Sequence, residues 1–196
     1  MVYVDLAFRV NGTKLPVDHG YALYASLNRL IPALHESKEV GVHPIRGRYT
    51  GDGLLSLIPS SRLILPLPSE SISTYLKLAG KAIGVDGHRL RLGVPEVRAL
   101  KPVASLYSRL VTIKGFMEPE PFLEAARRQV AQLGVQAELA LGERRTLRVK
   151  GKQVVGFEVL ATGLSAEDSI ALQEKGLGGR RHLGCGVFVP HAARGK

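Results

Sequence analysis

The chain has 196 residues, of which 45% are hydrophobic, so it can fold around a core of its own rather than stay disordered. Its formal charge of +10 and isoelectric point near 10.0 indicate a polyanionic partner, with nucleic acid the first choice and an acidic membrane surface the second. The sequence contains no long apolar run, signal peptide or basic amphipathic helix, which disfavours the membrane and predicts a soluble, cytoplasmic protein. One cysteine excludes an intramolecular disulfide, and the six histidines match no zinc spacing, so we expect no metal and no cofactor.

The chain begins with its clearest strand, at residues 2–10, where apolar and polar residues alternate. A helix capped by Asp18 is expected next, because Leu23 and Leu27 begin an apolar stripe with helical spacing. Pro32 should bend or end this helix early, since proline cannot continue the hydrogen-bonding pattern.

Five further elements complete the first half of the chain. Strands are predicted at residues 41–48 and 54–58, around a turn, and residues 62–67 extend the same sheet. A helical pattern at 71–78 and a strand at 89–94 give the order β-α-β-β-α-β.

The second half repeats this order. A strand at residues 106–113 precedes a helix that starts at Glu118-Pro-Glu-Pro121, where acid and proline suit a first turn, and that ends before Gly134. Strands at 136–141 and 154–160 follow, joined by a basic arm. Ser165 caps a helix to about Lys175, and a last strand closes the chain. The arm carries Arg144, Arg145, Arg148, Lys150 and Lys152.

Two tandem βαββαβ units predict an α+β protein with two ferredoxin-like (RRM-like) domains, residues 1–101 and 102–196. Such sheets often bind RNA, but the aromatic and basic motif of RNA-recognition domains is absent from the sequence. With 6% aromatic residues and no tryptophan, base stacking is a poor source of affinity. We therefore expect backbone contact with structured RNA.

A glycine-rich loop precedes the last strand. Its glycines predict either positive backbone φ angles or the close approach of a ligand, and its adjacent arginines predict that such a ligand is anionic. A flexible basic loop is the alternative. The loop is Gly176-Leu-Gly178-Gly179-Arg180-Arg181-His182-Leu-Gly184-Cys-Gly186.

The loop has the form Gly-h-Gly-x5-Gly-h-Gly, in which h is apolar. A tandem ferredoxin-like chain that ends in this loop resembles the repeat-associated mysterious proteins of CRISPR systems. Within that superfamily it is similar to the endoribonucleases that mature CRISPR RNA, which place a histidine at or near the first helix. His19 matches that position.

The resemblance implies metal-independent cleavage of a repeat stem-loop by the 2'-hydroxyl beside the scissile phosphate, leaving a 2',3'-cyclic phosphate. His19 is the expected base, since the positive end of a helix keeps an imidazole neutral. Packing between helix and sheet is its alternative role. Tyr24, like Tyr21, is a candidate to orient the phosphate or assist the base. Helical projection groups His35 with Tyr21 and Tyr24 on a polar face, where it is expected to be solvated, with a catalytic role as the alternative. His182 is expected to contact phosphate or to position the arginines.

The resemblance also implies that the basic hairpin arm, Arg144, Arg145, Arg148 and Lys150, grips the base of the repeat stem-loop. Together with the glycine loop it forms the expected RNA-binding surface. After cleavage the product is expected to stay bound, so subunits of a CRISPR effector complex are expected partners. Lys38 is the first lysine after His19, which leaves the transition-state donor unidentified.

The main alternative is a non-catalytic RNA-binding subunit, either of a CRISPR effector or of a ribosome-like assembly. Composition does not exclude it. The two-histidine phosphoesterases, which also have duplicated ferredoxin-like halves, are set aside because none of the six histidines is followed two residues later by Thr or Ser.

Overall fold

The computed structural model describes residues 2–191. Met1 and residues 192–196, including the predicted end of the second domain, lie outside the described residues. The chain divides into two compact units. The first runs to Ala99 and also includes residues 148–150 and 182–184, and the second contains the rest.

The first unit is built on a four-stranded antiparallel sheet in the order β5-β1-β7-β6. A separate three-stranded sheet has the order β2-β4-β3. The elements are β1 (Tyr3–Asn11), β2 (Lys14–Pro16), α1 (Gly20–Leu30), α2 (Ala33–Glu36), β3 (Arg48–Gly51), β4 (Leu54–Ser56), β5 (Arg62–Pro68), α3 (Ile72–Tyr75) between two 3-10 turns, β6 (Ala82–Val85) and β7 (His88–Ala99).

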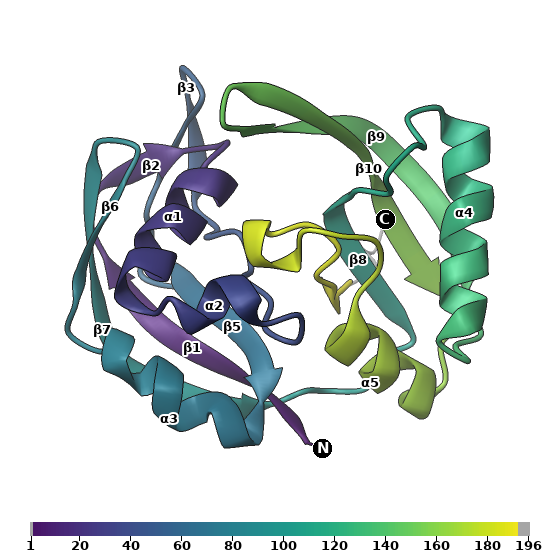
Figure 1. Ribbon diagram of the computed structural model, residues 1–196, viewed down its shortest axis with the longest axis horizontal. Coiled ribbons are helices and arrows are strands. Elements are labelled where there is room, and N and C mark those ends of the chain that lie inside the picture. The colour runs from purple at the N-terminus through teal and green to yellow at the C-terminus, as the bar shows by residue number, and fades with distance from the viewer. Residues whose placement is uncertain (1, 192–196) are drawn as a thin grey trace. The chain divides into compact units, whose positions relative to one another are not determined.

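One face of the first sheet is apolar. Leu6 and Phe8 of the central strand β1 are fully buried, as the alternating pattern predicted. Leu23 and Leu27 of α1 are also buried, and the Ser26 hydroxyl of this helix donates a hydrogen bond to the carbonyl of Gly84 in β6. In Figure 1, α1 and α2 pass in front of β1 and β5.

The first unit differs from the sequence-based expectation in its connections. The predicted strand at 41–48 is wrong over most of its length: this segment is irregular, although the N–H groups of Gly41 and His43 bond to β5. The hairpin β3–β4 forms around the predicted turn but belongs to the small sheet. The hairpin β6–β7 was not foreseen in full, although its turn, Asp86-Gly87, has the two positive φ angles that an Asp-Gly pair favours.

The second unit has the strand order β11-β8-β10-β9, the 4-1-3-2 arrangement of a βαββαβ chain. The predicted fold class is confirmed. Its elements are β8 (Ser105–Val111), α4 (Pro119–Gln132), β9 (Glu138–Val149), β10 (Lys152–Thr162), α5 (Ala166–Lys175) and β11 (Val189–Pro190).

The predicted start of α4 at Glu118-Pro119 and the predicted cap of α5 are confirmed. Ser165 caps α5, with its hydroxyl oxygen accepting the N–H of Asp168 at 3.0 Å. Phe122 of α4 packs on Phe157 of β10 with ring centroids 4.9 Å apart, so α4 covers the apolar face of this sheet. The basic arm is the far end of the long hairpin β9–β10, which turns at Lys150-Gly151, both with positive φ.

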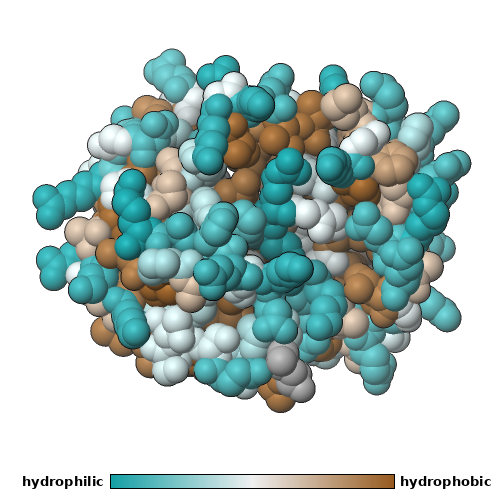
Figure 2. Space-filling model, in the orientation of Figure 1, coloured by the Kyte–Doolittle hydropathy of each residue, from teal (hydrophilic) through white to brown (hydrophobic). Residues whose placement is uncertain are grey.

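Hydrophilic side chains cover much of the molecular face in Figure 2, with apolar patches between them. Among the described residues, no helix combines the length and the hydrophobicity needed to cross a membrane.

Candidate active site

A tyrosine and a histidine from different helices of the first unit meet in a short hydrogen bond. The phenol oxygen of Tyr24, on α1, lies 2.5 Å from Nδ1 of His35, on α2. In a continuous helix, residues eleven positions apart lie about 16 Å apart along the axis. The break at Pro32 ends α1 and redirects the chain, which brings the two rings together.

The environment of the pair keeps the phenol neutral and the imidazole accessible. Tyr24 is only 8% exposed, and this burial, with a smaller effect of Tyr21, raises the pKa of its phenol. His35 is exposed. When Nδ1–H of His35 donates to the phenol oxygen, Nε2 holds the lone pair and can accept a proton from solvent or substrate.

His182 adds a third ring to this cluster. Residues 182–184 belong to the first unit, and the His182 ring lies on Tyr24 with centroids 4.6 Å apart. Tyr24 therefore contacts two histidines. Helical projection placed His35 on the same face as Tyr24, but neither contact was predicted. Pro32 was the feature of the sequence that could have indicated the contact between Tyr24 and His35. A break in the helix at Pro32 brings residues on either side of it together, whereas projection on one continuous helix placed His35 on a solvated face.

The structure places His19 inside the first unit, where it is 2% exposed. Its Nδ1 lies 2.7 Å from the Pro16 carbonyl, and the N–H of Ile45 donates to Nε2 at 3.0 Å. A carbonyl can only accept and an amide N–H can only donate, so the ring is neutral with its proton on Nδ1. The expected neutral state is present, but the lone pair that a base needs is directed at Ile45. These contacts support packing, and a catalytic role of His19 stays a prediction.

In the glycine loop the close approach is made by the protein itself. A Cβ on Gly186 would lie 1.9 Å from the carbonyl oxygen of Leu177, and one on Gly178 would lie 2.4 Å from that of Thr112. Gly176 would meet the carbonyl oxygen of Gly186 at 2.3 Å. The need for glycine at these positions is therefore explained without a ligand.

The two adjacent loop arginines have different environments. Arg180 is exposed and has a φ of 64°, a left-handed conformation that is unusual for a residue with a side chain. Arg181 is 9% exposed, and its guanidinium donates to the carbonyl of Gln173 at 3.4 Å. Of the two side chains, the exposed Arg180 is accessible to a ligand, whereas Arg181 packs inside the second unit.

The basic hairpin arm also contains two environments. Arg144, Arg148 and Lys150 are exposed. Arg145 is half-buried and forms ion pairs with Glu158 at 2.7 Å and Glu143 at 2.8 Å. Its charge is therefore already engaged within the hairpin.

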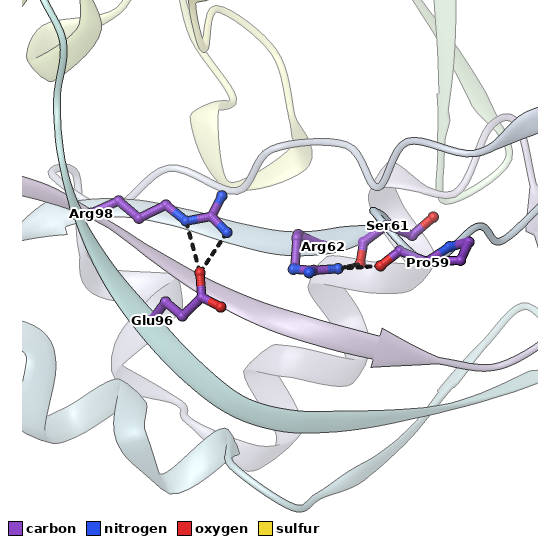
Figure 3. A network of polar contacts seen from close by, with 5 residues as sticks. All are labelled: Pro59, Ser61, Arg62, Glu96 and Arg98. Carbon is purple, nitrogen blue, oxygen red and sulfur yellow. Dashed lines mark hydrogen bonds and ion pairs between the residues drawn. The ribbon is translucent and has the colours of Figure 1, made fainter.

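The first sheet carries further arginines on one face. Arg9 on β1 lies directly opposite Arg62 on β5, and Arg98 on β7 pairs with Glu96 at 2.7 Å (Figure 3). The neighbouring Asp5 is largely buried, which raises its pKa to about 6 despite the nearby Arg98. The described residues contain no group of three or more His, Cys, Asp or Glu side chains that would hold a metal ion.

The fold defines a class, the α+β proteins with two ferredoxin-like domains in tandem. Residues 4–193 match the family model Cas6, described as Cas6 Crispr, and the chain belongs to this family. This confirms the resemblance drawn from the glycine loop and the element order.

A curated relative agrees with this assignment, and two solved structures share the fold. The CRISPR-associated endonuclease Cas6 of Myxococcus xanthus (strain DK1622) is 47% identical over 190 residues, which cover 97% of this chain and 82% of the relative. The prediction of a CRISPR-associated endonuclease is confirmed at this level. A Cas6-related protein from Pyrococcus furiosus is 15% identical with a TM-score of 0.69 and coverages of 95% and 98%. Thermus thermophilus Cse3, bound to an RNA representing a pre-cleavage complex, is 16% identical with a TM-score of 0.51 and coverages of 96% and 98%.

Proposed function

We propose that this chain cleaves CRISPR repeat RNA through attack of a ribose 2'-hydroxyl on the adjacent phosphate, with His35 and Tyr24 at the reacting atoms. The observation that carries the proposal is the hydrogen bond between the buried Tyr24 phenol and the exposed His35 imidazole. The endonuclease relative and the RNA-bound Cse3 structure supply the substrate class.

The proposed chemistry needs a base, an acid and donors to the phosphate. Tyr24 holds Nδ1–H of His35, so Nε2 takes the proton of the 2'-hydroxyl. The 2'-oxygen then bonds to phosphorus, and the bond from phosphorus to the 5'-oxygen breaks. An acid protonates that oxygen, giving a 5'-hydroxyl and a 2',3'-cyclic phosphate. The neutral Tyr24 phenol keeps its own proton to donate to a phosphate oxygen.

His19 is the second candidate for the base, as the sequence predicted. For this role its Nε2 must leave the N–H of Ile45, and a buried donor would lose its partner. His35 needs no such rearrangement, because its ring is already exposed.

The RNA-binding part of the proposal rests on exposed charge. Arg144, Arg148 and Lys150 on the hairpin, and Arg180 on the glycine loop, are the cations that contact phosphates. Tight phosphate contact also favours retention of the cleaved product, which would make the protein a lasting subunit of an effector complex. Affinity should therefore fall steeply as salt rises.

A cleavage assay in excess chelator tests the proposal. We expect the protein to cut its own repeat at one position and to leave a 2',3'-cyclic phosphate. A repeat with a single 2'-deoxynucleotide at that position should bind equally well and remain uncut, because the attacking group is missing. A protein that binds the unmodified repeat tightly and never cuts it would instead be the non-catalytic RNA-binding subunit.

Substitution of the two loop arginines separates contact from packing. Arg180→Ala should weaken repeat binding several-fold and reduce the slope of log affinity against log salt by about one. Arg181→Ala should mainly lower the melting temperature, because this side chain is buried. Arg127→Ala, on the exposed side of α4, is the matched control for loss of one positive charge. An equal loss of affinity in Arg127→Ala and Arg180→Ala would leave Arg180 without a specific contact.

A further inference from the structure

An acidic side chain lies at the centre of the basic hairpin. Glu158, on β10, has a side chain only 15% exposed. Its Oε1 accepts hydrogen bonds from Nε and Nη2 of Arg145, on β9, at 2.8 and 2.7 Å. Its Oε2 accepts the main-chain N–H of Glu143, also on β9, at 3.3 Å. Both oxygens of this carboxylate therefore hold the neighbouring strand.

The neighbouring residues leave space for this carboxylate and bond to it. A Cβ on Gly142 would lie 2.6 Å from Oε2 of Glu158 and 3.0 Å from its Cβ, so glycine leaves the space that the carboxylate occupies. On the opposite neighbour, β8, burial and then a hydrogen bond to Glu158 raise the pKa of Tyr107 to about 12. Glu158 thus joins β8, β10 and β9 across one sheet.

Electrostatics alone does not explain a carboxylate at this place. In a protein with a formal charge of +10 that binds a polyanion, a negative group in the binding hairpin repels the ligand and neutralises one of the hairpin's arginines. Its effect on binding must then be indirect. Arg144 lies between Glu143, whose N–H bonds to Glu158, and Arg145, whose guanidinium does the same, so Glu158 fixes the main chain from which the exposed Arg144 side chain extends.

We propose that Glu158 is a positioning residue for RNA binding, which anchors Arg145 and the β9 backbone so that the exposed arginine Arg144 is aimed at the RNA. This inference rests on the proposed function of the hairpin. It assigns Arg145 to the support of the site and not to phosphate contact.

The direction in which one substitution changes the affinity for RNA tests the proposal. Glu158→Gln removes a negative charge, so a purely electrostatic role predicts tighter binding to a repeat stem-loop. Positioning predicts the opposite, a dissociation constant raised about fivefold, the effect of losing a charge-assisted hydrogen bond. The matched control is Glu143→Gln, which removes the same charge beside the same arginine from a side chain that is 72% exposed. It should bind as tightly as the wild type or slightly tighter.

Three further variants separate positioning from contact. Arg145→Lys keeps the charge but loses the double hydrogen bond, so it should behave like Glu158→Gln, whereas a phosphate contact would largely survive. Gly142→Ala changes no charge and displaces the carboxylate, so it should also weaken binding. Combining Glu158→Gln with Arg144→Ala should cost little more than Arg144→Ala alone.

Circular dichroism at the assay temperature checks that each variant is folded. Weaker RNA binding by a folded variant is then not a result of lost stability. Unchanged or tighter binding by Glu158→Gln overturns the positioning role. Additive losses in the double variant also overturn it. A wild-type protein that fails to bind any repeat RNA refutes the proposed function instead, so the two failures are distinguishable.

Discussion

Replacement of His35 with alanine should lower the single-turnover cleavage rate by about 10²- to 10⁴-fold, the usual contribution of general acid–base catalysis. Repeat affinity should stay within about threefold of the wild type, because the substitution removes an exposed ring and no permanent charge. Rates measured with saturating protein and labelled repeat report this step directly. Tyr24→Phe should lower the rate about tenfold, since it removes the hydroxyl that holds Nδ1.

The matched control for His35→Ala is His88→Ala, at the start of β7 and outside the Tyr24 cluster, which should cleave as fast as the wild type. Wild-type cleavage by His35→Ala would remove His35 from the mechanism. If His19→Asn instead abolished cleavage in a folded protein, the base would be His19. The buried contacts of His19 lead us to expect that this variant is less stable but retains cleavage once folded.

The difference between His19 and His35 shows what the sequence could predict about the site. Periodicity located the first helix and its buried residues Leu23 and Leu27, and Pro32 marked where it ends. The predicted cap was wrong: no side chain caps α1, and the Asp18 carboxylate accepts the N–H of Arg148 at 3.1 Å instead. Periodicity does not give the path of the chain after the break. That path places His35 against Tyr24 and brings the N–H of Ile45 to His19, whose other ring nitrogen meets the nearby Pro16 carbonyl. The contacts with Tyr24 and Ile45 both depend on how the chain turns after α1, which helical periodicity does not give.

Long elements with strong patterns were predicted better than short ones. The alternation in β1 and the acid and proline start of α4 were sufficient to locate these elements. β6 has only four residues, too few for a period to be recognised. The helical pattern predicted at 71–78 is present as α3 and the 3-10 turn that follows it. The segment at 41–48 has apolar residues typical of a strand, and Val42 and Ile45 are buried, but the segment is irregular. Burial alone therefore does not distinguish a strand from a buried loop.

The glycine loop was recognised from its pattern, but the pattern has a different physical basis from the one expected. The sequence predicted positive φ angles or the close approach of a ligand, and the groups that approach the main chain are carbonyls of the loop itself and of the segment at the end of β8. The N–H of Leu177 donates to the carbonyl of Gly186 at 3.1 Å, and the N–H of Gly186 donates to the carbonyl of Leu110 at 2.7 Å. The loop is thus a folded element that presents Arg180, rather than a bare cradle.

Replacement of Gly186 with alanine should therefore destabilise the protein by more than about 3 kcal/mol. The positive φ of 64° alone costs an alanine about 1 to 2 kcal/mol, and the new Cβ would lie 1.9 Å from a main-chain oxygen that the loop holds in place. Urea unfolding of the two proteins, followed by circular dichroism, measures this difference.

Gly163→Ala is the control that isolates the clash. Gly163 has a φ of 72° and its Cβ would meet no atom of the described residues within 4 Å, so this variant should lose only about 1 kcal/mol. Equal losses of stability in Gly163→Ala and Gly186→Ala would show that the clash with the loop backbone adds nothing to the cost of the substitution at Gly186.

Gly179 gives the complementary test for a ligand, because its φ is not positive and its Cβ is equally unobstructed among the described residues. If RNA approaches the loop backbone there, Gly179→Ala should weaken repeat binding at unchanged stability, whereas unchanged binding would leave Arg180 as the contact that the loop provides.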